Sequence, residues 1–326
     1  MHHSLICILS GLAVLSSVLG LTLDPSVAIV ALAIGIAAIG VPHGSLDHVF
    51  GRRLLEPRLG RFWRMSFFAA YSTTAVVVAA GWLIMPLATA IFFFIVSAWH
   101  FGMEDEPVTG LTGWRRHRDA IALGGILIWV PSLFRAEEMR DILSSIVPSA
   151  MPISSPQIVF VTQGIALLML AIAMFAVAAT ATSRFLWWVA LRYVTFAILF
   201  ATTPILVSFG IYFCLWHSVR GLQSLKTEMN ISLVRFVAAL LPLTIGAAML
   251  IGIGAFWWSE GRTVSSELTR SIFIGLSAIA VPHLLLHAAA GTSIVRRWAV
   301  SGSSVQVVAR EPNFSVATQS QHGAHA

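Results

Sequence analysis

Charged residues are scarce in this chain of 326 residues. Asp, Glu, Lys and Arg make up 10% of it, whereas a soluble domain has about 25%. Hydrophobic residues make up 57%, and apolar runs of about twenty residues recur along the whole length, as in transmembrane helices. A membrane β-barrel has short alternating segments instead. The sequence therefore predicts an all-α polytopic membrane protein.

Cysteine and the common cofactor motifs are also scarce. Cys7 and Cys214, the only two cysteines, lie far apart in apolar segments, so they fit no paired-cysteine metal site and are expected as small buried residues. The chain has no glycine-rich nucleotide loop, Walker motif or serine-centred nucleophile elbow. Its net charge of +6 is spread over short loops, and no basic domain is present to bind nucleic acid.

Apolar segments divide the first 300 residues into a predicted bundle of about ten transmembrane helices. They lie at approximately 4–22, 26–47, 65–84, 87–103, 120–134, 157–180, 185–203, 204–220, 235–257 and 271–291. The fifth is short enough to be re-entrant, and the seventh and eighth form either a tight hairpin or one kinked helix. The first lacks the basic residues of a signal peptide and is expected as an uncleaved helix. Residues 301–326 have no long apolar run and predict a disordered tail.

Basic residues predict the orientation in the membrane. The loops after even-numbered spans hold most of the Lys and Arg residues, whereas the opposite loops hold only four. These four are Arg135, Arg140, Arg262 and Arg270. The positive-inside rule then places both termini, and the tail, in the cytoplasm of a multi-pass cell-membrane protein.

Histidines recur near the ends of four apolar spans. The motifs are Gly40–His48 with the sequence GVPHGSLDH, Trp99–Gly102 (WHFG), Trp216–Arg220 (WHSVR) and Val281–His283 (VPH). They lie in the second, fourth, eighth and tenth spans, which run in the same direction. We therefore expect His43, His100, His217 and His283 at one depth, in the cytoplasmic half of the bilayer.

Several imidazoles at one depth in hydrocarbon suggest a metal site. An ionisable residue inside a membrane is costly and is a functional-site hypothesis by default, histidine is the commonest metal ligand, and helix bundles hold metals with side chains from facing helices. The alternative is a set of core histidines that form hydrogen bonds with neighbouring helices. The candidate ligands are rich in nitrogen and contain no thiolate, which suits iron, zinc or copper equally.

Two further side chains extend this candidate site. Asp47 lies four residues after His43, so on a helix the two share a face. Asp47 is then either a direct ligand, an acceptor for the second N–H of a bound histidine, or, with His48, part of a solvated helix end. His287 follows His283 by four residues, which is metal-ligand spacing. The acidic run Glu104–Glu106 is expected to be a solvated helix end.

Aromatic residues near the histidine motifs offer walls for an apolar cavity, or else face lipid and the membrane interface. The candidates are Phe92, Phe93, Phe94, Trp99, Phe213, Trp216, Trp257 and Trp258.

These motifs together resemble the Brp/Blh family, the bacteriorhodopsin-related β-carotene 15,15'-dioxygenases. The segment Gly40–His48 is similar to the family's first motif, His100-Phe101-Gly102 and Trp216–Arg220 to its later ones, and Pro282-His283 to a Pro-His near its last helix. The resemblance covers positions 40 to 287, nearly all of the membrane portion.

The resemblance implies a catalytic transmembrane domain over residues 1–300 that uses non-haem Fe(II) and O₂. It would cleave β-carotene, or a related carotenoid, at its central double bond into two retinals, which then pass into lipid and towards a microbial rhodopsin. His43, His100 and His217 match the family's iron ligands, and His283 or His287 is expected to complete the set.

One position departs from the family pattern. The family motif continues with a second proposed ligand histidine, where this chain has Gly221. A histidine there would lie one turn after His217 on the same face. If the family's second histidine ligates at this position, the site has room for it. If His283 or His287 has taken over its role, a histidine at 221 would crowd the site, and we favour His283.

Three other function classes stay open from the residues alone. Histidine pairs can bind haem axially in an electron-transfer protein. Intramembrane histidines can form a proton relay in a transporter or a rhodopsin-associated protein without enzyme activity. A di-iron oxygenase is less favoured because such sites are rich in carboxylates.

Overall fold

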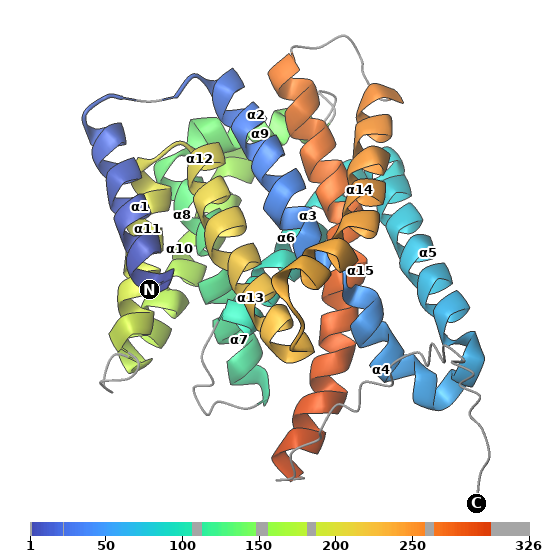
Figure 1. The fold of residues 1–326 in the computed structure, drawn as a ribbon. Helices are drawn as coiled ribbons and strands as arrows, with labels where there is room; N and C mark the ends of the chain where they lie inside the picture. The colour runs from blue at the N-terminus through green and yellow to red at the C-terminus, as the bar shows by residue number, and fades with distance from the viewer. Residues whose placement is uncertain are drawn as a thin grey trace, which may run out of the picture.

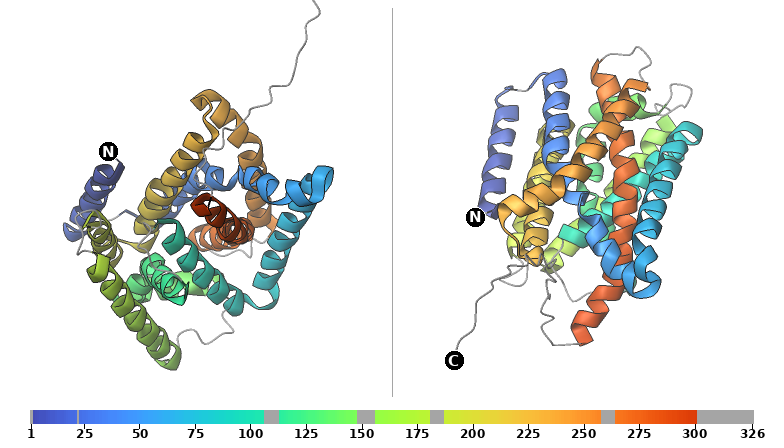
Figure 2. Two further views of the ribbon diagram at one scale, coloured as in Figure 1. Left: turned by 90° about the horizontal axis from the view of Figure 1, so that it is seen from below. Right: turned by 45° about the vertical axis from the view of Figure 1, so that its right-hand side comes forward.

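The computed structural model describes residues 2–21, 23–105, 113–147, 156–180, 187–257 and 264–300. Within these ranges all regular secondary structure is helical, which confirms the all-α prediction. The long apolar helices stand side by side in a bundle (Figures 1 and 2). The chain is therefore a helical membrane protein, as its composition predicts.

Six helical stretches in the described residues are long and apolar enough to cross a membrane, fewer than the ten spans predicted. They are Pro25–Ile84, Pro86–Glu104, Val159–Ala179, Ile205–Met229, Leu233–Ile253 and Ser265–Ala289. The second and third predicted spans merge into the first of these stretches, which turns back at Gly60. The first and seventh give the shorter apolar helices Ser4–Val18 and Ala190–Thr202.

The fifth predicted span is not one helix. It is divided at Gly125 into α7 (Gly113–Gly124) and α8 (Ile126–Phe134). Two consecutive glycines, Gly124 and Gly125, weaken the helix at this point because glycine has the largest backbone entropy to lose. The same glycines allow close packing, because a Cβ on Gly124 would collide with the carbonyl oxygen of Ala98.

The four histidine-bearing segments run in the same direction, from the upper to the lower end of Figure 1. Their elements are α2 (Pro25–Gly35), η1 (Ile36–Gly40) and α3 (Val41–Gly44); α6 (Pro86–Asp105); α12 (Ile205–Gly210), η3 (Ile211–Ser218) and α13 (Val219–Met229); and α15 (Val264–Val300). The shared direction agrees with the prediction from sequence order.

The remaining helices surround these segments. They are α1 (His2–Val18), α4 (Asp47–Leu59), η2 (Gly60–Phe62), α5 (Trp63–Ile84), α9 (Ala136–Ile146), α10 (Pro156–Thr180), α11 (Trp187–Thr202) and α14 (Leu233–Trp257). Helix α15 packs against α2, α5, α9 and α14 and lies near the middle of the bundle when viewed along its axis (Figure 2). Because α15 is central, its side chains can contact those of several other helices.

Basic segments gather at one end of the bundle. The arginine-bearing helices α4, α7 and α13 all lie towards the lower end of Figure 1, where α15 also ends. An ion pair between Arg53 of α4 and Glu228 of α13 connects two of them. This grouping agrees with the predicted charge asymmetry, and the assignment of that end to the cytoplasm stays a prediction. The predicted tail, 301–326, lies outside the described residues.

Candidate metal centre

Five histidines from four helical segments meet inside the bundle. The ring centroids of His43 and His217 are 5.1 Å apart, and those of His100 and His217 are 5.3 Å apart. His283 lies 5.1 Å from His43 and 5.3 Å from His100, and His287 lies 4.2 Å from His283. The four histidines that the sequence places at one level of the bundle therefore lie together, and His287 lies beside them.

Two of the histidines belong to segments with a widened helical turn. The π-helix η1 ends directly before Val41-Pro42-His43, and the π-helix η3 contains His217. Proline has no N–H and cannot continue the normal hydrogen-bond pattern, which accounts for a disturbed turn next to Pro42. The η3 segment contains no proline. Because π-helical turns change the direction of the side chains that follow and are frequent at functional sites, both segments help to aim these imidazoles inward.

The donor atoms fall into two adjacent groups. The first consists of His43, His100 and His217, and the second of Asp47, His283 and His287. Within each group one potential ligand atom per residue lies within 4.8 Å of the others. Two nitrogens bound to one ion at about 2.1 Å are at most about 4.2 Å apart, so small side-chain movements would let either group close on an ion.

Several ring nitrogens in this cluster are buried without a hydrogen-bond partner among the described residues. They are both nitrogens of His43 and the Nε2 atoms of His100, His283 and His287. Leaving a buried polar atom unsatisfied costs about 1–3 kcal/mol, so several such atoms in one place need a common explanation. A metal ion satisfies inward-facing imidazole nitrogens, and the donor set therefore fits one.

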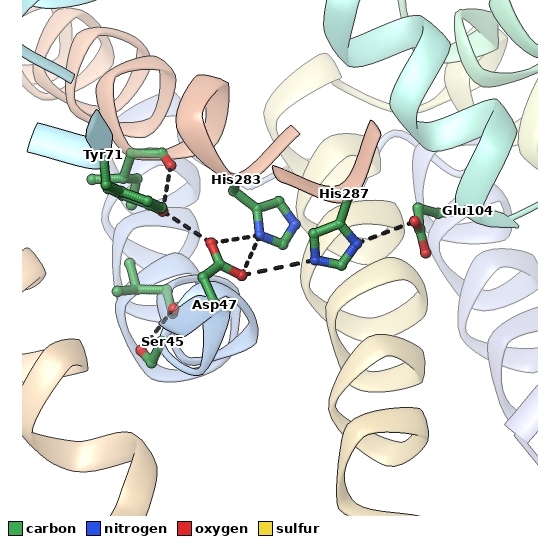
Figure 3. A network of polar contacts seen from close by, with 8 residues as sticks. Ser45, Asp47, Tyr71, Glu104, His283 and His287 are labelled. Atoms are coloured by element: carbon green, nitrogen blue, oxygen red, sulfur yellow. Dashed lines mark hydrogen bonds and ion pairs between the residues drawn. The ribbon is translucent and has the colours of Figure 1, made fainter. Parts of the chain in front are cut away.

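The carboxylate of Asp47 lies on the Nδ1 side of the His283 ring (Figure 3). Nδ1 of His283 lies 2.8 Å and 3.0 Å from the two carboxylate oxygens of Asp47. The Tyr71 hydroxyl lies 3.0 Å from Asp47 Oδ2 and also 3.0 Å from the carbonyl oxygen of Ile279, so the two acceptors share its one proton. Because Nδ1–H of His283 donates to Asp47, Nε2 keeps its lone pair and is available as a ligand.

His287 lies between two carboxylates (Figure 3). Its Nδ1 is 3.3 Å from Glu104 Oε1, and its Nε2 is 3.8 Å from Asp47 Oδ1. Glu104 is therefore part of the polar network and not only a solvated helix end, although its side chain is 45% exposed. The side chains of Asp105 and Glu106 lie outside the described residues. No signal in the sequence linked Glu104 to His287, which lies on another helix.

Gly221 directly faces His43, and the space here agrees with the alternative in which a histidine at 221 would crowd the site. A Cβ on Gly221 would collide with Cε1 and Nδ1 of His43, and would lie 3.2 Å from its Nε2. A histidine at position 221 therefore could not be added to the present arrangement. The missing side chain is what allows the His43 ring to occupy its place against α13.

A cavity of about 390 Å³ opens onto the histidines. Of the predicted aromatic walls, Phe93, Phe94 and Phe213 line it, whereas Phe92, Trp99 and Trp216 do not. The side chains of Trp257 and Trp258 lie outside the described residues. His43, Asp47, His48, His100, His217 and His283 also line the cavity, so it joins a largely apolar space to the polar cluster.

The sequence comparisons agree on one family. A family model described as β-carotene 15,15'-dioxygenase matches residues 34–289, which include all five clustered histidines. A β-carotene 15,15'-dioxygenase from the uncultured marine bacterium 66A03 is 26% identical over 255 residues, covering 76% of this chain and 88% of the relative. A probable β-carotene 15,15'-dioxygenase Blh from Halobacterium salinarum is 24% identical over 303 residues, covering 84% and 87%. No solved structure matches the chain significantly.

Proposed function

The chain belongs to the β-carotene 15,15'-dioxygenase family, and on that premise we propose that it cleaves β-carotene, or a related carotenoid, in the membrane. The reaction adds O₂ across the central double bond and gives two molecules of retinal. The observation that carries the proposal is the cluster of inward-facing histidines in the wall of a largely apolar cavity. Neither the haem-binding nor the transport alternative accounts for the family match.

We assign His43, His100 and His217 as ligands of a non-haem ferrous ion, with Nε2 of His283 as the fourth. The unpartnered nitrogens of His43, His100 and His283 support this set. Asp47 acts through His283, because a carboxylate that accepts the second N–H of a bound histidine fixes its tautomer and its orientation. Asp47 is thus a positioning residue in this proposal and not a direct catalyst.

His287 is left outside this ligand set. Its Nδ1 lies 3.3 Å from Glu104 Oε1, and its Nε2, which makes no hydrogen bond among the described residues, lies 3.8 Å from Asp47 Oδ1. We therefore assign His287 to the network between these two carboxylates. The two carboxylates also balance the charge of a divalent ion in a region where an uncompensated charge would be costly.

The remaining residues of the site bind and shield the substrate. When bound, the ferrous ion supplies the one-electron chemistry that O₂ needs to react with an alkene. One double bond and one O₂ become two carbonyl groups, so the protein has to orient the polyene and exclude water, and delivers no proton. Phe93, Phe94 and Phe213 suit this task because apolar walls bind a hydrocarbon and keep the site dry.

Expression in cells that accumulate β-carotene tests the proposal. We expect loss of the carotenoid colour with formation of retinal, and neither change in His100→Ala produced at the same level in the membrane. Intact, iron-loaded protein that forms no retinal would contradict the proposed activity. A haem Soret band in the purified protein would favour electron transfer instead.

A further inference from the structure

As far as the described residues show, the cavity at the histidines is exposed on one side only. Its exposed lining residues are Phe68 and Ser72 of α5, and Leu243, Gly246 and Leu250 of α14. The other lining residues are buried or half-buried. The opening of the cavity therefore lies between α5 and α14.

The inner wall behind this opening leads to the metal centre. Both α5 and α14 pack against α15, which lies inward of them (Figure 2). Along α15, Leu276, Ala280 and His283 follow one another at helical spacing, and all three line the cavity. A molecule that enters between α5 and α14 thus meets a continuous apolar surface that ends at His283.

The outer surface around the opening is apolar. Met65 and Val76 on α5 are 68% and 67% exposed, and Met249 on α14 is 61% exposed. Residues 66–84 and 236–257 contain no charged side chain. Because these helices are surrounded by hydrocarbon in a membrane, the opening leads into the bilayer and not into water.

We propose that the gap between α5 and α14 is a lateral portal through which the carotenoid leaves the bilayer and reaches the histidines. Ile142 of α9 and Ile205 of α12, which also line the cavity, are buried, so the rod-shaped substrate enters from the exposed side, one end first. This inference rests on the proposed carotenoid substrate. It adds the route of entry and assigns Gly246 and Ser72 to it.

Two glycines of α14 provide a matched test. A Cβ on Gly246 or on Gly252 would have nothing within 4 Å, so both positions have room for a larger side chain, but only Gly246 lines the cavity. In Gly246→Trp the indole should obstruct the portal and lower the rate of retinal formation at least about tenfold. Gly252→Trp should stay close to the natural rate, and both variants should keep their iron. Natural turnover in an iron-loaded Gly246→Trp would overturn the portal.

A binding measurement separates the portal from the chemistry. Gly246→Cys and Gly252→Cys are prepared with Cys7 and Cys214 replaced by alanine, reconstituted in vesicles, and treated with a lipid-soluble thiol reagent without oxygen. β-Carotene should slow labelling at Gly246→Cys and leave Gly252→Cys unaffected. Equal labelling with and without β-carotene at Gly246→Cys would refute the portal. Protection in a protein that forms no retinal under oxygen would support the portal and refute the proposed reaction.

Discussion

Gly221→Ala adds only one methyl group, but we expect it to disturb the His43 ring and with it the iron site. The added Cβ would overlap the His43 ring, whereas carbon atoms in contact prefer about 3.5–4.0 Å. The ring, or the backbone of α13, would therefore have to move by more than about 1 Å. A displacement of this size at a reacting centre costs on the order of 100-fold in rate. We accordingly expect iron occupancy to fall and retinal formation to drop about 100-fold, with Gly221→His more severe still.

The assay compares iron per chain and retinal formation in the natural protein, Gly221→Ala and Gly164→Ala. Gly164 lies on α10, and a Cβ there would meet nothing within 4 Å. Alanine is favoured over glycine in a helix by roughly 0.5–1 kcal/mol, so helix propensity would stabilise both variants. A loss in Gly221→Ala alone must then come from the contact with His43. Natural iron content and turnover in Gly221→Ala would show that the contact between residue 221 and His43 does not control the iron site.

Three further predictions concern the network and the topology. Asp47→Asn should weaken iron binding about 10- to 100-fold, as for other groups behind a metal ligand, and an unchanged iron affinity would remove Asp47 from that role. His283→Ala should lose iron whereas His287→Ala keeps it, measured by metal analysis of both purified variants; the opposite pattern would exchange their roles. A cysteine at the exposed Arg58 should resist a membrane-impermeant thiol reagent in intact cells, since we place that end in the cytoplasm, and ready labelling would reverse the orientation.

Much of the site could be predicted because a membrane restricts a helix to two directions. Once the apolar segments are ordered, the direction of each follows, and the depth of His43, His100, His217 and His283 follows from that. Their convergence on one cluster was therefore accessible from sequence. The Pro-His pairs and the four-residue spacing of His283 and His287 further indicate a metal site at this depth.

Contacts within the plane of the membrane were not predictable in the same way. Hydropathy gives the depth of a residue but not its neighbours, so the pairing of Glu104 with His287 and of Gly221 with His43 had no sequence signal. The π-helix around His217 could not be predicted either, because this segment contains no proline that would indicate a disturbed turn. The family pattern marks Gly221 as unusual, and the structure connects its missing side chain to the place of His43.

The lengths of the apolar segments alone also predict more membrane-spanning helices than the described residues contain. Residues 120–134 are apolar, yet Gly124 and Gly125 end α7 and allow α8 to begin separately. A hydropathy average does not register such a break. The close approach of α6 and α7, where a Cβ on Gly102 would collide with the carbonyl oxygen of Ala120, depends on the same small residues.

In the proposed function the histidine cluster holds one iron ion, at which O₂ cleaves a carotenoid. The most direct test is metal analysis of the purified natural protein, followed by single-turnover reaction of the same sample with β-carotene when O₂ is admitted. We expect about one iron ion per chain, retinal in proportion to the iron, and loss of both in His100→Ala. Retinal formation by protein without iron, or an iron content unchanged in His100→Ala, would contradict it.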